Sequence, residues 1–155
     1  MRSKRAKKRP LESDPIYKSK VVNRMINVVM LDGKKSTARK IVYGVLEKLS
    51  DDRKEAVKIF EEAVKNVMPS KEVRSRRIGG ATYQVPYPLK HDRSEALAIR
   101  WIVKAARDKQ GTDMITRLHK EIVDASEGVG SAITKRDQVH KTAESNRAFA
   151  HFARF

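Results

Sequence analysis

The sequence predicts a mainly α protein, a bundle of about six helices with one protruding β-hairpin and a flexible basic N-terminal tail. Three observations support this fold class. Apolar residues recur at helical spacing over most of the chain, a Gly-Gly pair joins two arms of strand character, and cations crowd the first residues. The length of 155 residues suits a single helical domain, which we place at 16–155, after a tail at 1–15.

The predicted tail is strongly basic and carries no apolar residues at helical spacing. Six cations come before the first acidic residue, Glu12, and Pro10 and Pro15 break any helix. A run of like charges is usually disordered when free, and we expect it to order only when phosphate groups neutralise it. The cations are Arg2, Lys4, Arg5, Lys7, Lys8 and Arg9.

Three amphipathic helices are predicted next along the chain. Apolar residues recur at i, i+3 and i+4 over 22–30, and Gly33 supplies a stop signal. The same spacing predicts a second helix from near Ser36 and a third from near Asp52. Pro69 ends the third helix, because proline cannot continue a helix interior.

A β-hairpin is predicted over about 71–88. Gly79 and Gly80 suit the positive φ angles that a tight hairpin turn needs. On the first arm Arg74 and Arg76 share one face, while Arg77 lies on the other. A two-stranded ribbon is only marginally stable in water, and clustered arginines repel one another. We therefore expect a polyanion to lie against this hairpin, and a merely solvated hairpin is the alternative.

The fourth predicted helix is apolar on nearly every side, which indicates a central and buried position. Asp92 and Glu95 mark its start as capping residues, and Trp101 is expected in the core rather than as a platform on which nucleotides stack. Four cations at spacings of seven, four and three residues fall on one stripe of this helix. The stripe is either the solvent-facing edge of a core helix or an open basic surface that faces phosphates. Its members are Arg93, Arg100, Lys104 and Arg107.

Two further helices are predicted towards the C-terminus. One runs from about Thr112 until Gly128 and Gly130 interrupt it, and a more polar one begins near Ser131. Three phenylalanines follow, and they dock either on their own domain or on a partner. These residues are Phe149, Phe152 and Phe155.

The charge balance points to a negatively charged partner. Lysine and arginine total 35 against 19 acidic residues, which gives a formal charge of +16. Nucleic acid is the first candidate, and no apolar run is long enough to span a bilayer. The absence of cysteine excludes thiolate metal sites and disulfides, and the four histidines show no zinc spacing. No pair of carboxylates suggests acid–base catalysis, so we predict no enzyme activity, no cofactor and no metal.

The alternative function is that of a DNA-binding regulatory or chromatin-like basic protein. The second and third predicted helices of this chain are closely joined, as in a helix-turn-helix. Glu61 and Glu62 on the third helix, however, would repel the backbone of a DNA duplex. The positive charge is spread over the tail, the loop after Gly33, the hairpin and the fourth helix, which favours a folded RNA. Tyr83 and Tyr87, beside arginines, are candidates for stacking on unpaired bases.

The stretch 72–86 closely resembles the hairpin of the bacterial small-subunit ribosomal protein seven family. Four other segments fall where that family has its own markers: 14–17, 32–35, 100–107 and 143–151. The chain departs from the family pattern where it ends in Phe155 and where Tyr87-Pro88 follows the hairpin, which leaves the length of the second arm open.

The resemblance implies a role in the cytoplasmic ribosome, in the head of the small subunit. It implies binding to the 3′ major domain of small-subunit rRNA, nucleation of head assembly, and a C-terminal helix that approaches platform protein eleven. The residues implied to face rRNA are Arg2, Lys4, Arg5, Lys7, Lys8, Arg9, Lys34, Lys35, Arg74, Arg76, Arg77, Arg93, Arg100 and Lys104. Those implied to lie near exit-site tRNA and mRNA are Ile78, Gly79, Gly80, Ala81, Thr82 and Tyr83.

Overall fold

Six α-helices, one 3₁₀-helix and one antiparallel β-hairpin make up residues 9–153, the part of the chain that the computed structural model describes. This confirms the predicted mainly α fold with a single hairpin. The elements are α1 (Lys20–Val29), α2 (Lys35–Leu49), α3 (Arg53–Val67), β1 (Lys71–Ile78), β2 (Ala81–Pro88), α4 (His91–Asp108), α5 (Met114–Ser126), α6 (Ser131–Ser145) and η1 (Arg147–Phe152).

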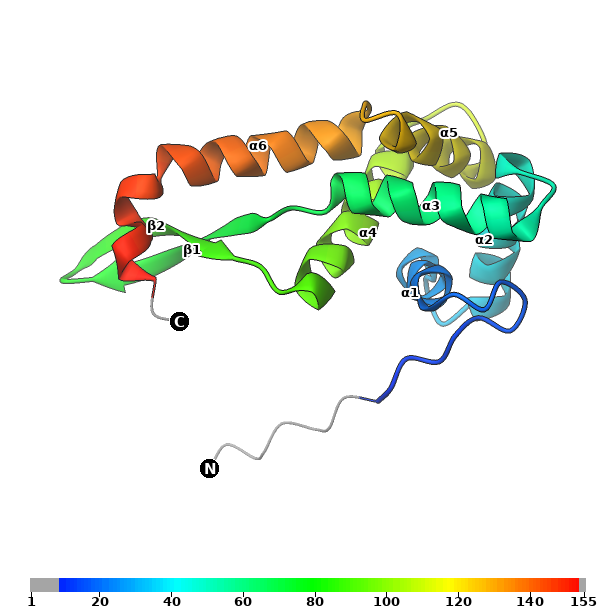
Figure 1. Ribbon diagram of the computed structural model, residues 1–155, viewed down its shortest axis with the longest axis horizontal. Coiled ribbons are helices and arrows are strands. Elements are labelled where there is room, and N and C mark those ends of the chain that lie inside the picture. Colours follow the sequence, from blue (N-terminus) through cyan, green and yellow to red (C-terminus); the bar gives the residue numbers. More distant parts are fainter. Residues whose placement is uncertain (1–8, 154–155) are drawn as a thin grey trace.

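The molecule has two parts of different construction (Figure 1). We call helices α1 to α5 the body, and the hairpin together with α6 and η1 the arm. In the body α5 packs against α2, α3 and α4, while α1 packs against α2 and α4. In the arm α6 runs beside β1, and η1 folds back onto β2. Because α4 contacts both α1 and α6, it connects the two parts.

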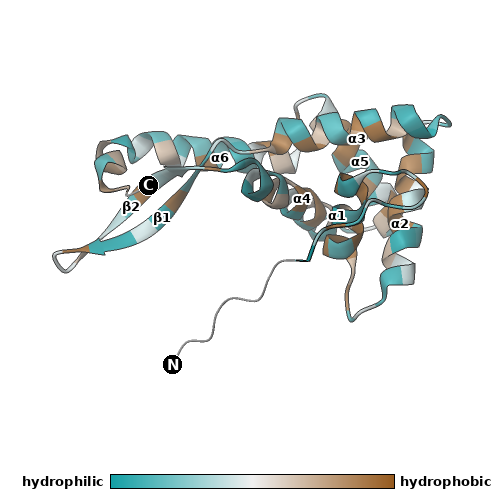
Figure 2. Cartoon of the chain, turned by 60° about the horizontal axis from the view of Figure 1, so that its bottom comes forward, coloured by the Kyte–Doolittle hydropathy of each residue, from teal (hydrophilic) through white to brown (hydrophobic). Residues whose placement is uncertain are grey.

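The body is built around the apolar stripes that the sequence predicts. Met25 of α1, Phe60 of α3 and Ile99 of α4 are at most 1% exposed. Figure 2 shows hydrophobic residues gathered on the sides of these helices that face one another. Burial of such side chains stabilises a fold by about 1.5–3 kcal/mol each.

The hairpin closes at the predicted glycines. Gly79 and Gly80 have φ angles of +56° and +88°, and Ile78 pairs with Ala81, which defines a two-residue turn. Positive φ at both central positions matches the right-handed twist of the flanking strands. Strand β2 continues to Pro88, opposite Lys71, so the second arm is as long as the first.

The segment before α1 is fixed to the body through Asp14, which lies inside the predicted tail and is 2% exposed. Its carboxylate accepts hydrogen bonds from the backbone N–H groups of Ile16 and Tyr17, each at 3.0 Å. The hydroxyl of Tyr43 on α2 donates to the same carboxylate at 2.8 Å. Burial and this hydrogen bond raise the pKa of Tyr43 to about 12.

A buried carboxylate connects the body to the arm. Glu121 of α5 has no exposed surface, and its Oε2 lies 2.6 Å from the Nζ of Lys109. Its Oε1 accepts a hydrogen bond of 2.8 Å from the N–H of Ala132, in the first turn of α6. A negative charge there satisfies an unpaired N–H group and complements the helix dipole.

Candidate nucleic-acid interface

An exposed row of cations runs along α4. Arg93, Arg100, Lys104 and Arg107 are all exposed. At 100° per residue they fall within an arc of about 60°, and at 1.5 Å per residue the row is about 21 Å long. We call these four residues the α4 stripe. The remaining faces of the helix are buried against the body or turned towards α6, so the stripe is its open edge.

One end of the stripe is joined to the root of the hairpin. The Nη2 of Arg93 lies 3.2 Å from the Oε2 of Glu72 on β1, and Arg74 contacts the other oxygen of the same carboxylate. The guanidinium of Arg74 also lies 5.3 Å from the ring centre of Tyr87. Glu72 offsets one of these two cations and fixes the hairpin root next to α4.

The other end of the stripe is joined to α1. The guanidinium of Arg107 donates to the carbonyl oxygens of Val28 and Val29, at 3.4 and 3.1 Å. These carbonyls belong to the last turn of α1, where no intrahelical partner is available. The loop that carries Lys34 and Lys35, both exposed, starts directly after that turn. The two predicted basic regions, loop and helix, are therefore neighbours.

The middle of the stripe keeps its charge unneutralised. Among residues 9–153, Arg100 and Lys104 take part in no ion pair.

Of the six predicted tail contacts, only Arg9 lies within the described residues, and it is exposed. The other predicted tail contacts fall outside the described residues: Arg2, Lys4, Arg5, Lys7 and Lys8.

The C-terminal segment covers part of the hairpin. The ring of Tyr83 lies 5.2 Å from that of Phe149 and 5.3 Å from that of Phe152, measured between centroids. The guanidinium of Arg76 donates to the carbonyl of Phe152. The structure therefore favours docking of these phenylalanines on their own domain, and Tyr83 and Arg76 already have partners within the chain. Arg77 stays exposed.

The tip of the hairpin is open. Gly79, Gly80, Ala81 and Thr82 are exposed, and a Cβ added at either glycine would meet nothing within 4 Å. Ile78 is partly buried. The tip is small and uncharged, so another molecule can approach its backbone closely.

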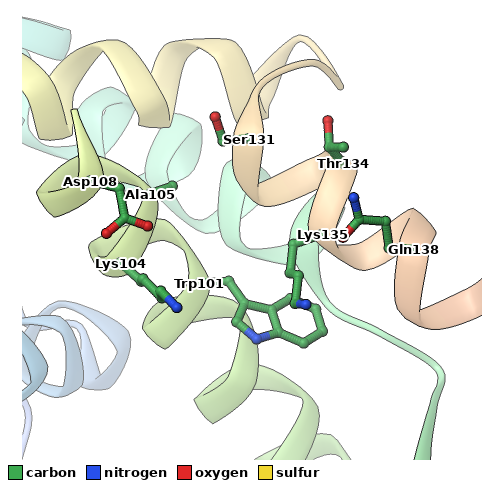
Figure 3. Close-up of a pocket in the computed structure, with 8 residues that line it drawn as sticks. All are labelled: Trp101, Lys104, Ala105, Asp108, Ser131, Thr134, Lys135 and Gln138. Carbon is green, nitrogen blue, oxygen red and sulfur yellow. The ribbon is translucent and has the colours of Figure 1, made fainter.

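Trp101 differs from the expectation that it lies within the core. It packs against the core but remains partly exposed, and it lines a groove of about 400 Å³ between α4 and α6 (Figure 3). The side chains of α6 that line the groove opposite the indole are all polar. The residues that line the groove are Trp101, Lys104, Ala105, Asp108, Ser131, Thr134, Lys135 and Gln138. Sequence reasoning did not include Lys135 and Gln138 in a site, because the periodicity of one helix does not show which other helix packs beside it.

Two further properties bear on function within the described part of the chain. Residues 9–153 contain no group of three His, Cys, Asp or Glu side chains that could hold a metal ion. None of the helices in that range has the length and apolar character needed to cross a bilayer.

Comparison with known proteins identifies close relatives. A family model described as ribosomal protein S7p/S5e matches residues 1–147. The small ribosomal subunit protein uS7 of Fervidobacterium nodosum is 52% identical over 153 residues, which cover 98% of this chain and 99% of that protein. The protein of the same name from Nautilia profundicola is 50% identical over 153 residues, with the same coverage. That from Acholeplasma laidlawii is 50% identical over 146 residues, which cover 94% of each chain.

Proposed function

The chain belongs to the ribosomal protein S7p/S5e family, and on that premise we propose that its α4 stripe, hairpin root and α1–α2 loop bind the 3′ major domain of small-subunit rRNA. Family membership makes the chain a structural constituent of the small ribosomal subunit, working with rRNA and other ribosomal proteins. It also confirms the prediction that the chain is not an enzyme, and it leaves the DNA-binding alternative without support.

The observation that carries the proposal is the α4 stripe with both of its ends fixed. Arg93 is held by Glu72, Arg107 is held by the end of α1, and the cations between them are exposed. A row of cations about 21 Å long whose two ends are held by the fold supplies phosphate contacts with little rearrangement of the backbone on binding. RNA in the A form is recognised largely through shape and backbone, so such a row suits a folded RNA.

The test removes charge from the middle of the stripe. For the double variant Arg100→Ala, Lys104→Ala we expect weaker binding to an rRNA fragment of the 3′ major domain. The slope of log K against log salt should fall by about 1.4–1.8, because two phosphate contacts are lost. The melting temperature should stay nearly constant, since both side chains are exposed.

The matched control is Lys58→Ala, Lys120→Ala, which removes two exposed cations from α3 and α5. It changes the net charge equally but leaves the stripe intact. If both double variants lower the salt slope by the same amount, net charge rather than the stripe drives binding, and the proposal is wrong.

We also propose a division of labour along the hairpin, in a protein that nucleates assembly of the subunit head. The root, with Arg74, shares the rRNA surface, and the uncharged tip approaches exit-site tRNA and mRNA. Arg77, which we predicted at the base of the hairpin, pairs with Thr82 next to the turn and lies nearer the tip. Helix α6 faces platform protein eleven. Support comes from the open tip and from the ion pairs that hold the root against α4.

Excision of 78–81 with a short reconnecting turn should leave affinity for the rRNA fragment within about tenfold. Exit-site occupancy by deacylated tRNA on reconstituted subunits should change. For Arg74→Ala, Arg93→Ala we expect the reverse, because the two cations that contact Glu72 at the root are lost. Equal damage to both activities by both variants would contradict the division.

A further inference from the structure

Two helix faces oppose one another across the groove that contains Trp101. On α4 the lining residues are Trp101, Lys104, Ala105 and Asp108, at positions i, i+3, i+4 and i+7. On α6 the lining residues Ser131, Thr134, Lys135 and Gln138 have the same spacing. Such faces normally interdigitate and fill the space between two helices. Here Ala105, Ser131 and Thr134 are too short to do so, and a groove of about 400 Å³ remains (Figure 3).

The groove continues past the indole. A second hollow of about 280 Å³ shares Trp101, Lys135 and Gln138 and extends to Val73 of β1 and Leu97 of α4. Trp101 therefore stands between two adjoining hollows, which is an unusual position for the largest side chain of a helix whose neighbouring residues Ile102 and Val103 are at most 1% exposed. A volume of this order lies within the range of about 300–1,000 Å³ found for small-ligand sites.

The charge of the groove favours a phosphate-bearing ligand. Lys104 and Lys135 face it from opposite helices, against one carboxylate, Asp108, in the lining of the larger hollow. The second hollow adds Glu72, whose charge is already paired with Arg74 and Arg93. Lys104 also belongs to the α4 stripe, so the groove opens directly beside the surface assigned to rRNA. The amide of Gln138 supplies both a donor and an acceptor for a polar ring edge.

We propose that this groove binds one unpaired nucleotide of an RNA strand, with its base stacked on the indole of Trp101. Lys104 and Lys135 face its phosphates, and Gln138 meets an edge of the base. Aromatic side chains stack on bases of any sequence, so the site selects an unpaired nucleotide rather than a particular base. This inference rests on the proposed function and adds to it a defined place for one splayed-out nucleotide.

Trp101 is the only tryptophan in the chain, so its fluorescence reports on the groove directly. The full chain is titrated with the rRNA fragment while binding and indole emission are recorded together. Stacking of a base should quench the indole emission, and the quenching should reach its plateau at the same RNA concentration as binding. Uridine and adenosine monophosphates serve as free-nucleotide probes, and we expect them to bind at least about a hundredfold more weakly, because they lack the rest of the RNA surface.

The decisive variant fills the groove without touching the core. Thr134 is exposed on α6, and Thr134→Leu places a branched side chain in the space opposite the indole. We expect it to weaken binding of the rRNA fragment about tenfold and to abolish the quenching, with an unchanged melting temperature. Thr116→Leu, on an exposed position of α5, is the matched control and should change neither quantity.

The outcomes separate this inference from the proposed function. If the fragment binds fully without quenching, the nucleotide site is overturned and rRNA binding stays in place. The same holds if Thr134→Leu binds the fragment as the wild type does. Failure of the fragment to bind overturns both. A saturable response to micromolar monophosphate assigns the groove to a free nucleotide and contradicts the RNA site. Quenching only after other small-subunit proteins are added assigns the groove to a protein segment.

Discussion

The body and the arm are held together by different kinds of interaction. In the body, apolar side chains from its five helices meet in one core, and residues such as Val22, Ile102 and Leu118 have no exposed surface. The first turn of α6 joins this core through Ala132 and Ile133. In the arm, the hairpin contributes only Val85 and Pro86 as buried apolar residues of its own. The body therefore depends on the summed burial of many side chains, whereas the hairpin and η1 depend on a few directional contacts.

Those directional contacts come from all sides of the hairpin. Glu72 binds Arg93 at the root, and the N–H of Ser70 donates to the Nε2 of His140 at 3.0 Å. Further along, Tyr83 packs on the phenylalanines of η1. Interactions of this kind fix orientation more than they add stability, since each one contributes about 1 kcal/mol or less at the surface. The contrast teaches that the arm can be loosened while the body stays folded.

The largest effect is expected from a cavity in the body. Phe60 is 1% exposed, so Phe60→Ala should lower the free energy of unfolding by about 3–5 kcal/mol. Phe149→Ala in the arm should lower it by only about 0.5–1.5 kcal/mol, because it removes an aromatic contact at a partly exposed site. Chemical denaturation of both variants measures the difference. Equal losses would mean that η1 and the hairpin are packed as tightly as the body.

An intermediate effect is expected at the joint between the two parts. Glu121→Ala removes the partner of Lys109 and of the Ala132 N–H, and should cost about 1.5–3 kcal/mol. Lys109 is 29% exposed and can turn to water, which keeps the loss below that of a fully buried pair. Hydrogen exchange should speed up in α6 more than in α2. Glu127→Ala, at an exposed position just after α5, is the control, and faster exchange there as well would argue against a specific joint.

The smallest effect at neutral pH concerns Tyr43, which ties the segment at Asp14 to the body. Its pKa is raised from 10.0 to about 12, so folding favours the protonated phenol. Its contribution to stability is complete below pH 10 and is lost as the pH rises through about 12. In Tyr43→Phe this part of the loss of stability at alkaline pH should disappear. In a titration followed by phenolate absorbance, the tyrosine that ionises at the highest pH should be missing. An unchanged alkaline decline would mean that the Tyr43–Asp14 bond contributes nothing to it.

Local sequence signals were sufficient to predict most of the fold. Apolar spacing predicted the buried faces of α1, α2 and α3, and Gly79-Gly80 predicted the turn and therefore the register of the hairpin. These features depend on residues within a few positions of one another. The four cations of α4 were also placed correctly on one exposed edge, because helical geometry alone determines that they share a face.

The polar contacts between residues far apart in the chain could not be predicted from the sequence. Glu95 was interpreted as a capping residue, but it is 9% exposed and forms an ion pair of 2.7 Å with Arg24 of α1. Glu72 and Glu121 likewise pair with residues that only the packed fold brings near them. In the candidate interface the same limit applied to Tyr83, whose ring could be assigned to stacking on RNA only as long as the position of η1 was unknown.

The contact between η1 and the hairpin also has a consequence in time. A ribosome that translates this chain makes Tyr83 long before it makes Phe149 and Phe152, which cover that ring. Every helix of the body has left the peptidyl-transferase centre by then, because α5 ends at Ser126. Contacts between residues so far apart in sequence form late, since a long loop must close first. The nascent protein therefore carries its arginine-rich hairpin for some time without the segment that covers Tyr83, and the arm acquires its final shape only once residue 152 has been added.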